Sequence, residues 1–409
     1  MYLTFFKKKE NSSLGAIAWK RFKRNHLAMG SLYFIGLLSL ISILGYLITP
    51  DQTPYANEQI LEFTTKKPGF KATILRIKKN EMEKSGNFIQ KMVYGEKNLY
   101  QIIPVYKWCF VGHDLKIEEY TGSSPNNGRI TYISLVDVAY ALKQQTLPQY
   151  TLDSVRFTTI NDEQQSSSLQ DIKKDILQNN LVRKTYLLGT DRYGRDVLSQ
   201  LMIGSRVSLS VGFISVLISL VIGIFLGAIA GYFGGKLDDF IVWFFSVIWS
   251  IPTLLLVIAI TFALGKGFWQ VFIAVGLTMW VEVARVVRGQ ILSIREKEYV
   301  EAARALGFSN FRIIFKHILP NVIGPVIVIS AANFSSAVLL EAGLSFLGIG
   351  VQPPMPSWGI MIRENYGYII LDYAYLAILP GIAIMLVVLA FMLIGNGLRD
   401  AMDVRTAER

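Results

Sequence analysis

The sequence predicts an all-α polytopic membrane protein with six transmembrane helices and an inserted extracytoplasmic α+β domain. First, 52% of the 409 residues are hydrophobic and the mean hydropathy is +0.39, which lies outside the range of soluble proteins. Second, the chain contains several apolar runs long enough to cross the ~30 Å hydrocarbon core of a bilayer. Third, one long polar segment separates the first of these runs from the rest.

The first apolar run is uncharged from Leu27 to Ile48 and follows a basic segment. It is too long for the apolar region of a signal peptide, and no small-x-small cleavage site follows it, so we expect a retained anchor; a cleaved signal is the alternative. The positive-inside rule then predicts a cytoplasmic N-terminal arm at 1–27 and a transmembrane helix at 28–48. The basic residues are Lys7, Lys8, Lys9, Lys20, Arg21, Lys23 and Arg24.

The polar insertion covers residues 49–187 and lies outside the membrane if the N-terminus is inside, because long loops translocate largely regardless of their charge. It contains short β-like runs and one amphipathic helical stretch, which predict a small α+β domain. His113 beside Asp114 lacks further ligand spacing and indicates surface structure rather than a metal site. The β-like runs are 99–111, 129–140 and 154–160, a linker is expected at 164–168, and Leu169, Ile172, Ile176 and Leu177 mark the helix.

Five further spans are expected in the C-terminal half, at about 207–233, 240–264, 268–287, 318–340 and 373–394. Six spans return the C-terminus to the cytoplasm, and the basic segment 285–316 faces the same side. Small residues recur every three or four positions in the second span, which predicts a close helix contact within this chain or with another chain. They are Ser208, Gly212, Ser215, Ser219, Gly223, Gly227 and Gly231.

Proline and ionisable residues mark special positions in the later spans. Pro252 and Pro325 are expected to interrupt helices, either beside a pathway or as simple kinks. Glu282 is expected to pair with Arg285 one helical turn away. Glu341 is expected at the end of the fifth span, either facing a cavity or at a solvent-exposed helix end. We expect Glu341 and Ser345 to line a translocation pathway.

The segment from Glu298 to Asn321 reads EYVEAARALGFSNFRIIFKHILPN; it begins in an expected cytoplasmic loop at 289–317 and runs into the start of the fifth span. Its pattern predicts a short helix, a turn at Gly307 and a second amphipathic helix that leads into the fifth span. Such a pair could lie on lipid head groups, or its alanines could permit close docking of a partner protein. Both interpretations remain open on the pattern alone.

This segment resembles the EAA loop of ABC importer permeases, which docks on ATP-binding subunits. The matching residues are Glu301, Ala302, Ala303, Gly307, Leu319 and Pro320. Other segments are similar to the second permease of the oligopeptide and dipeptide branch, namely 19–28, 188–199, 250–252, 341–359 and 394–405. His317, Asn396 and Val404 depart from the commoner family residues, and the insertion is longer than usual.

The resemblance implies a permease domain at 188–409 in a plasma (inner) membrane protein that imports di- or oligopeptides, or alternatively nickel or another small solute. The implied partners are a homologous second permease, two ATP-binding subunits, an extracytoplasmic substrate-binding protein and membrane lipid. ATP and Mg would be bound by partner subunits, because this chain has no GxxxxGK[ST] loop.

Other classes of function find less support in the sequence. This sequence has no HExxH or GxSxG motif, which an intramembrane enzyme or sensor would need. It also shows no internal repeat, which a secondary transporter usually has. The net charge is +11, but no nucleic-acid-binding motif accompanies the basic residues. Cys109 is the only cysteine in the sequence, so no metal site made of cysteines can form. We therefore expect no nucleic-acid partner, no resident cofactor, no metal and no catalytic residue in this chain.

Overall fold

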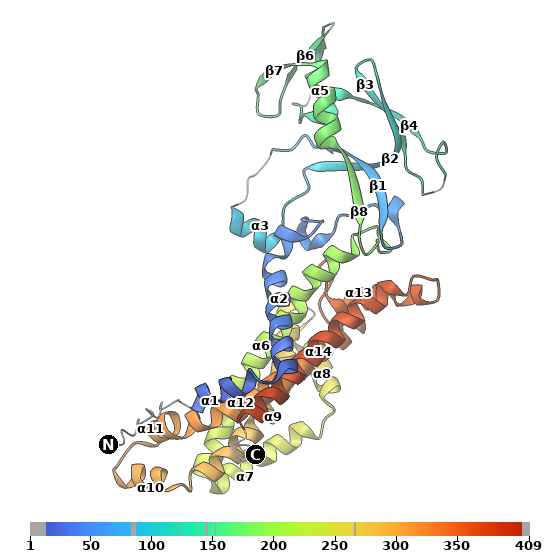
Figure 1. The fold of residues 1–409 in the computed structure, drawn as a ribbon. Coiled ribbons are helices and arrows are strands. Elements are labelled where there is room, and N and C mark those ends of the chain that lie inside the picture. The colour runs from blue at the N-terminus through green and yellow to red at the C-terminus, as the bar shows by residue number, and fades with distance from the viewer. Residues whose placement is uncertain are drawn as a thin grey trace, which may run out of the picture. The chain divides into compact units, whose positions relative to one another are not determined.

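The computed structural model describes residues 14–82, 87–122, 124–143, 146–151, 153–265 and 267–402. The first 13 residues of the expected arm 1–27, and residues 403–409 of the expected domain 188–409, lie outside these ranges. The chain forms two compact units (Figure 1). One contains Met1–Leu40, Ser205–Arg363 and Ile378–Arg409, and the other contains Ile41–Gly204 with Glu364–Ala377. We refer to them as the helical unit and the inserted unit.

The helical unit consists of long apolar helices and the short helices that join them. Among the described residues, five helical segments are long and apolar enough to cross a membrane: α2, α6, α9, α11 to α12 and α14. The helices that lie wholly or partly in this unit are α1 (Leu14–Phe22), α2 (His26–Ile48), α6 (Val197–Phe233), α7 (Gly235–Trp249), α8 (Thr253–Leu264), α9 (Phe268–Ile294), α10 (Glu298–Ala305), α11 (Asn310–Arg312), α12 (Leu319–Phe346), α13 (Trp358–Asn365) and α14 (Tyr375–Met402).

The expected span 240–264 is not one continuous helix. Helices α7 and α8 meet at an angle of 91°, and the pair gives a sixth span only if both are counted together. Pro252 has no amide hydrogen for a helical bond and precedes α8 with an extended backbone (ψ 124°), so the helix stops and restarts there. Pro325, in contrast, lies inside the continuous helix α12, so the expected interruption at this residue is wrong.

The glycines of α6 bring its backbone against neighbouring helices of the same chain. A Cβ atom added to Gly223 would lie 2.6 Å from the Cβ of Val283, and one added to Gly227 would lie 2.5 Å from the carbonyl oxygen of Ala284. Both neighbours belong to α9, whose apolar window is 67% buried compared with 39% for α6. The close contact predicted from the small residues is therefore made within this chain, and α9 is the central helix of the unit.

The inserted unit contains two antiparallel sheets and short helices. The larger sheet has the strand order β4-β3-β2-β1-β8 and the smaller one β5-β6-β7. The strands are β1 (Phe70–Lys78), β2 (Tyr100–Val111), β3 (Asp114–Glu119), β4 (Ile130–Ser134), β5 (Gln149–Tyr150), β6 (Ser154–Thr158), β7 (Gln164–Ser168) and β8 (Leu181–Tyr186). The α-helices are α3 (Phe88–Tyr94), α4 (Leu135–Ala139) and α5 (Leu169–Asp175), which a π-helical turn (Ile176–Asn180) extends.

The expected elements of the insertion are found in part. Strands β2 and β6 occur where they were predicted, but the run 129–140 changes from strand to helix at Leu135. The expected linker 164–168 is strand β7, paired with β6, because backbone pairing rather than apolar alternation forms this polar strand. Ile172 and Ile176 are fully buried as predicted, whereas Leu177 is 44% exposed.

A buried ion network joins two parts of the inserted unit. Arg195 donates one hydrogen bond to Asp191 and another to Glu364, each at 2.6 Å. Burial disfavours the charged guanidinium, but the carboxylates of Asp191 and Glu364 outweigh this effect and raise the pKa of Arg195. The network ties the segment before α6 to the segment Glu364–Ala377, so that these distant parts of the chain fold together.

Candidate functional site

The coupling segment, residues 298–320, is anchored on the helical unit by an apolar face. Val300 is fully buried and Ala303 is 4% exposed on α10, while Ile313 and Ile318 are fully buried in the π-helical turn (Ile313–Ile318). These side chains form one cluster with residues of α9 that include Val287. Burial of several aliphatic side chains, each worth about 1.5–3 kcal/mol, fixes the segment to the central helix. Ala303, one of the predicted docking residues, is therefore an anchor.

The turn between α10 and α11 depends on the backbone conformation of Gly307. Its φ angle is +74°, and no atom lies within 4 Å of the position that a Cβ would take. The glycine is therefore required for its left-handed backbone rather than for space. Beyond the turn, the Ser309 hydroxyl accepts a hydrogen bond from the amide of Arg312 and caps α11. Leu319 and Pro320 open α12, where a missing amide hydrogen costs little.

The outer face of the coupling segment is exposed. Glu301 and Ala302 lie on it as predicted. Leu306 is 73% exposed and Phe311 is 70% exposed, and the rings of Phe311 and Phe315 lie 4.3 Å apart. An apolar surface beside charged residues is typical of a protein interface. The sequence analysis did not single out Phe311 and Phe315, although residues four apart on a helix lie on the same face and could have indicated an aromatic patch.

Polar contacts connect this segment to the end of α6. The hydroxyl of Tyr232 donates a hydrogen bond to the side-chain oxygen of Asn310 at 2.9 Å. The guanidinium of Arg304 lies over the same tyrosine ring, 5.2 Å from its centroid. Both short helices therefore contact the end of α6 through Tyr232.

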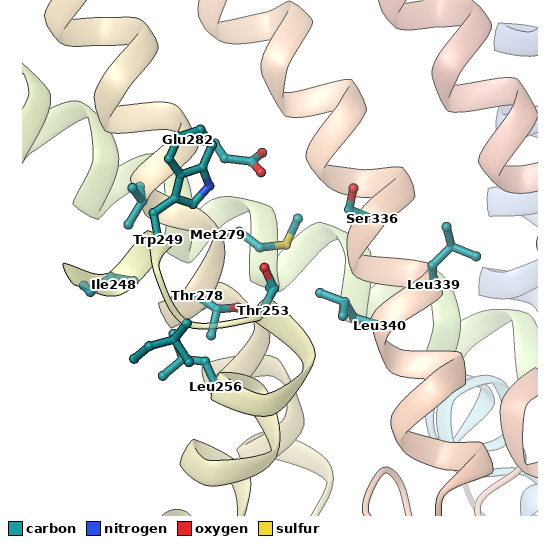
Figure 2. A pocket seen from close by; sticks show the side chains of 12 residues that line it. Ile248, Trp249, Thr253, Leu256, Thr278, Met279, Glu282, Ser336, Leu339 and Leu340 are labelled. Carbon is teal, nitrogen blue, oxygen red and sulfur yellow. The ribbon is translucent and has the colours of Figure 1, made fainter. Parts of the chain in front are cut away.

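A cavity of about 310 Å³ lies beside the break between α7 and α8 (Figure 2). Helices α9 and α12 form its other walls. Most of the lining is apolar, with hydroxyl groups at three positions and one carboxylate, that of Glu282. The lining residues are Ile248, Trp249, Ile251, Thr253, Leu256, Thr278, Met279, Val281, Glu282, Ser336, Leu339 and Leu340.

The ion pair predicted between Glu282 and Arg285 is not formed. The guanidinium of Arg285 instead lies 3.6 Å from the centroid of the Trp249 ring, and the structure assigns no ion pair to Glu282 among the described residues. A cation over an aromatic face is stabilised by the ring quadrupole, and here the ring comes from α7. Glu282 is left exposed to the cavity.

Glu341 and Ser345 occupy a closed polar cluster. Both are fully buried; the Ser345 hydroxyl donates to Glu341 at 2.7 Å and the Ser208 hydroxyl donates to it at 3.2 Å. Helix α12 continues to Phe346, so Glu341 does not lie at a solvent-exposed helix end. Glu341 also does not line the cavity described above. Hydroxyl donors satisfy the carboxyl group instead. A role of Glu341 and Ser345 in the pathway stays a prediction.

Within the described ranges, no group of three or more His, Cys, Asp or Glu side chains is placed to hold a metal ion.

Comparison with known proteins identifies the family. Residues 223–408 match the binding-protein-dependent transport system inner membrane component, and residues 13–68 match the N-terminal transmembrane domain of oligopeptide transport permease C. The dipeptide transport system permease protein DppC of Alkalihalophilus pseudofirmus is 44% identical over 215 residues, which cover 53% of this chain and 70% of the relative. The chain belongs to this permease family.

Other permeases are similar over the same extent. The oligopeptide transport system permease protein OppC of Haemophilus influenzae is 42% identical, with 53% of this chain and 70% of the relative covered. The glutathione transport system permease protein GsiD of Pectobacterium atrosepticum is 41% identical, with 53% and 71% covered. A solved structure of the inward-facing MetNI methionine ABC transporter aligns with 52% of this chain and 98% of its own, at 21% identity and a TM-score of 0.42. The family match, the similar permeases and the apolar helices show that the chain is a multi-pass membrane permease, one subunit of a transport system with further subunits.

Proposed function

We propose that this permease imports di- or oligopeptides, driven by ATP that partner subunits hydrolyse. Peptide import is supported by the names of similar permeases, which transport dipeptides, oligopeptides and glutathione. The observation that carries the transport mechanism is the coupling segment, whose inner face is buried against α9 while its outer face is exposed. Import of nickel or another small solute is the alternative for the substrate.

The proposed assembly contains a homologous second permease, two ATP-binding subunits and an extracytoplasmic substrate-binding protein. ATP and Mg would be bound by the ATP-binding subunits. In this arrangement six spans cross the plasma membrane, with the bent pair α7 and α8 taken as one span. Both termini and the coupling segment face the cytoplasm, and the insertion 49–187 is extracytoplasmic.

The proposed mechanism uses the coupling segment as a lever. ATP binding changes the ATPase surface on which Glu301 and Ala302 dock, and the segment moves with that surface. Its buried side chains transmit the movement to α9, and Tyr232 transmits it to α6. Access to the pathway then alternates between two conformations, because ATP favours one of them by differential binding.

Substitutions in the coupling segment test this mechanism. Glu301→Lys reverses an exposed charge, so the stability of the permease should change by no more than about 0.5 kcal/mol. In Gly307→Val, the β-branched side chain disfavours the left-handed backbone of this position, whereas asparagine in Gly307→Asn adopts that conformation more readily. We expect Glu301→Lys and Gly307→Val to insert in the membrane but to bind ATPase subunits poorly and to lose uptake. Co-purification, ATPase activity and peptide uptake measure these effects.

Two controls separate docking from general damage. Glu163→Lys makes the same charge reversal on an exposed residue of the inserted unit and should leave ATPase binding intact. Gly307→Asn should retain more coupling than Gly307→Val. Wild-type transport in both Glu301→Lys and Gly307→Val would refute the lever and favour a helix that rests on lipid head groups.

A further inference from the structure

We infer that the cavity beside the α7–α8 break is a cation-selective part of the transport pathway, in which Glu282 receives the ammonium group of a peptide. The inference rests on the proposed peptide substrate. It assigns a contact residue that neither the sequence motifs nor the coupling segment identifies.

The position of Glu282 within the membrane is the first argument. It lies on α9 inside the span expected at 268–287, three residues before Arg285. A carboxylate inside an apolar span is costly unless a partner, water or ligand compensates it. The nearest basic residue along the helix, Arg285, is engaged with the Trp249 ring. Arg285 still acts electrostatically on Glu282, but the two form no ion pair among the described residues, so the carboxylate of Glu282 is open to a cation that enters the cavity.

The other polar groups of the cavity suit an ammonium group. Thr253 of α8 and Ser336 of α12 have no side-chain hydrogen bond among the described residues, and Figure 2 shows them around the same opening as Glu282. An ammonium group has three donors and no acceptor, so one carboxylate and two hydroxyl oxygens match it. A transition-metal ion would favour imidazole or thiolate ligands, which the described lining lacks.

The size of the cavity limits what it holds. Its volume of about 310 Å³ lies at the low end of the range for small-molecule sites. It would therefore receive the amino end of a peptide rather than a whole oligopeptide. The α-amino group of a peptide has a pKa of about 7.7–8.0, so most of it is charged at neutral pH. Carbonyl groups and side chains further along the peptide would lie outside this cavity.

A charge-selectivity measurement tests the inference without knowledge of the natural substrate. In a Cys109→Ala background, Leu339→Cys places a thiol on the cavity wall of the assembled transporter. Its reaction with a trimethylammonium-ethyl and with a sulfonato-ethyl methanethiosulfonate gives a cation-to-anion rate ratio. Adding Glu282→Gln should lower this ratio by about tenfold, as expected when a nearby charge is removed in a site of low dielectric. Asp239→Asn, an equivalent change at an exposed residue of α7, should leave the ratio unchanged.

Uptake of radiolabelled alanyl-alanine tests the role in transport. We expect Glu282→Gln to lower uptake by about tenfold with assembly and basal ATPase activity retained, and Glu282→Asp to keep more uptake, because it preserves the charge. An unchanged rate ratio, or wild-type uptake in Glu282→Gln, would overturn the inference. If the wild-type transporter takes up no dipeptide although the ratio falls as expected, the peptide assignment fails while the cation selectivity of the cavity stands.

Discussion

The helical unit and the inserted unit bury their residues by opposite means. In the helical unit, Gly223 and Gly227 remove side chains so that the backbones of α6 and α9 come together. In the inserted unit, large aliphatic side chains such as Leu75 and Leu115 fill the space between sheet and helices. Lipid provides little hydrophobic driving force between helices, whereas water provides a large one for a sheet face. The packing of each unit therefore suits a different solvent, lipid for the helical unit and water for the inserted unit.

The largest expected effect is a difference in thiol labelling between the inserted unit and the coupling segment, which we expect on opposite sides of the membrane. Ser166 lies on exposed strand β7 of the inserted unit, and Ser309 lies on the exposed side of the coupling segment. In a Cys109→Ala background, we expect Ser166→Cys to react with a membrane-impermeant thiol reagent in intact cells whose outer barrier is permeabilised. Ser309→Cys should react only after the plasma membrane is opened, because the basic loops stay inside.

This labelling experiment has an all-or-none outcome. Solubilised transporter serves as the control, since both thiols should then react. Reaction of Ser309→Cys alone in intact cells would reverse the topology, and the insertion would then be cytoplasmic.

The buried network of the inserted unit gives the next largest effect. Arg195→Ala leaves Asp191 and Glu364 without their shared cation, and loss of one partner from a buried ion pair costs about 3–5 kcal/mol. We expect a lower unfolding temperature and faster proteolysis within the inserted unit. Lys67→Ala breaks the exposed pair with Asp372 and should leave the stability nearly unchanged, because water screens exposed charges. Equal losses in the two variants would show that the network adds no special stability.

Apolar runs and small-residue spacing were sufficient to predict most of the fold. The span 28–48 matches helix α2, and the spacing of Gly223 and Gly227 predicted the face that α9 contacts. Strands β1 and β8 were missed because they pair with each other across a long stretch of sequence. Strand β3 was also missed, although it forms a tight hairpin with β2. The polar strand β7 was missed because its side chains carry no apolar alternation. Backbone pairing between distant segments leaves little local signal.

The sites were predictable to different degrees. The short helix and the turn at Gly307 could be predicted because periodicity and turn residues are local properties. The docking role of Glu301 and Ala302 came from the family resemblance and stays a prediction. The surroundings of Glu282 could not be predicted, because helical spacing pairs it with Arg285, whereas the guanidinium of Arg285 lies over Trp249 of another helix. The closure of the cluster around Glu341 likewise depends on Ser208, 133 residues away. Tertiary contacts of this kind decide which charges are open to a ligand.

The smallest expected effect is the loss of stability when the close packing of α6 against α9 in the helical unit is disturbed. A methyl group on Gly223 would meet the carbonyl oxygen of Trp280 at 2.8 Å and the Cβ of Val283 at 2.6 Å, so Gly223→Ala must push α6 from α9. Overpacking of this kind costs about 1–3 kcal/mol. Gly289→Ala on α9 meets no atom within 4 Å and should be neutral or stabilising by up to about 1 kcal/mol through helix propensity. Thermal unfolding of the two purified variants in detergent measures the difference, and a Gly223→Ala variant as stable as Gly289→Ala would show that the contact between α6 and α9 can yield without cost.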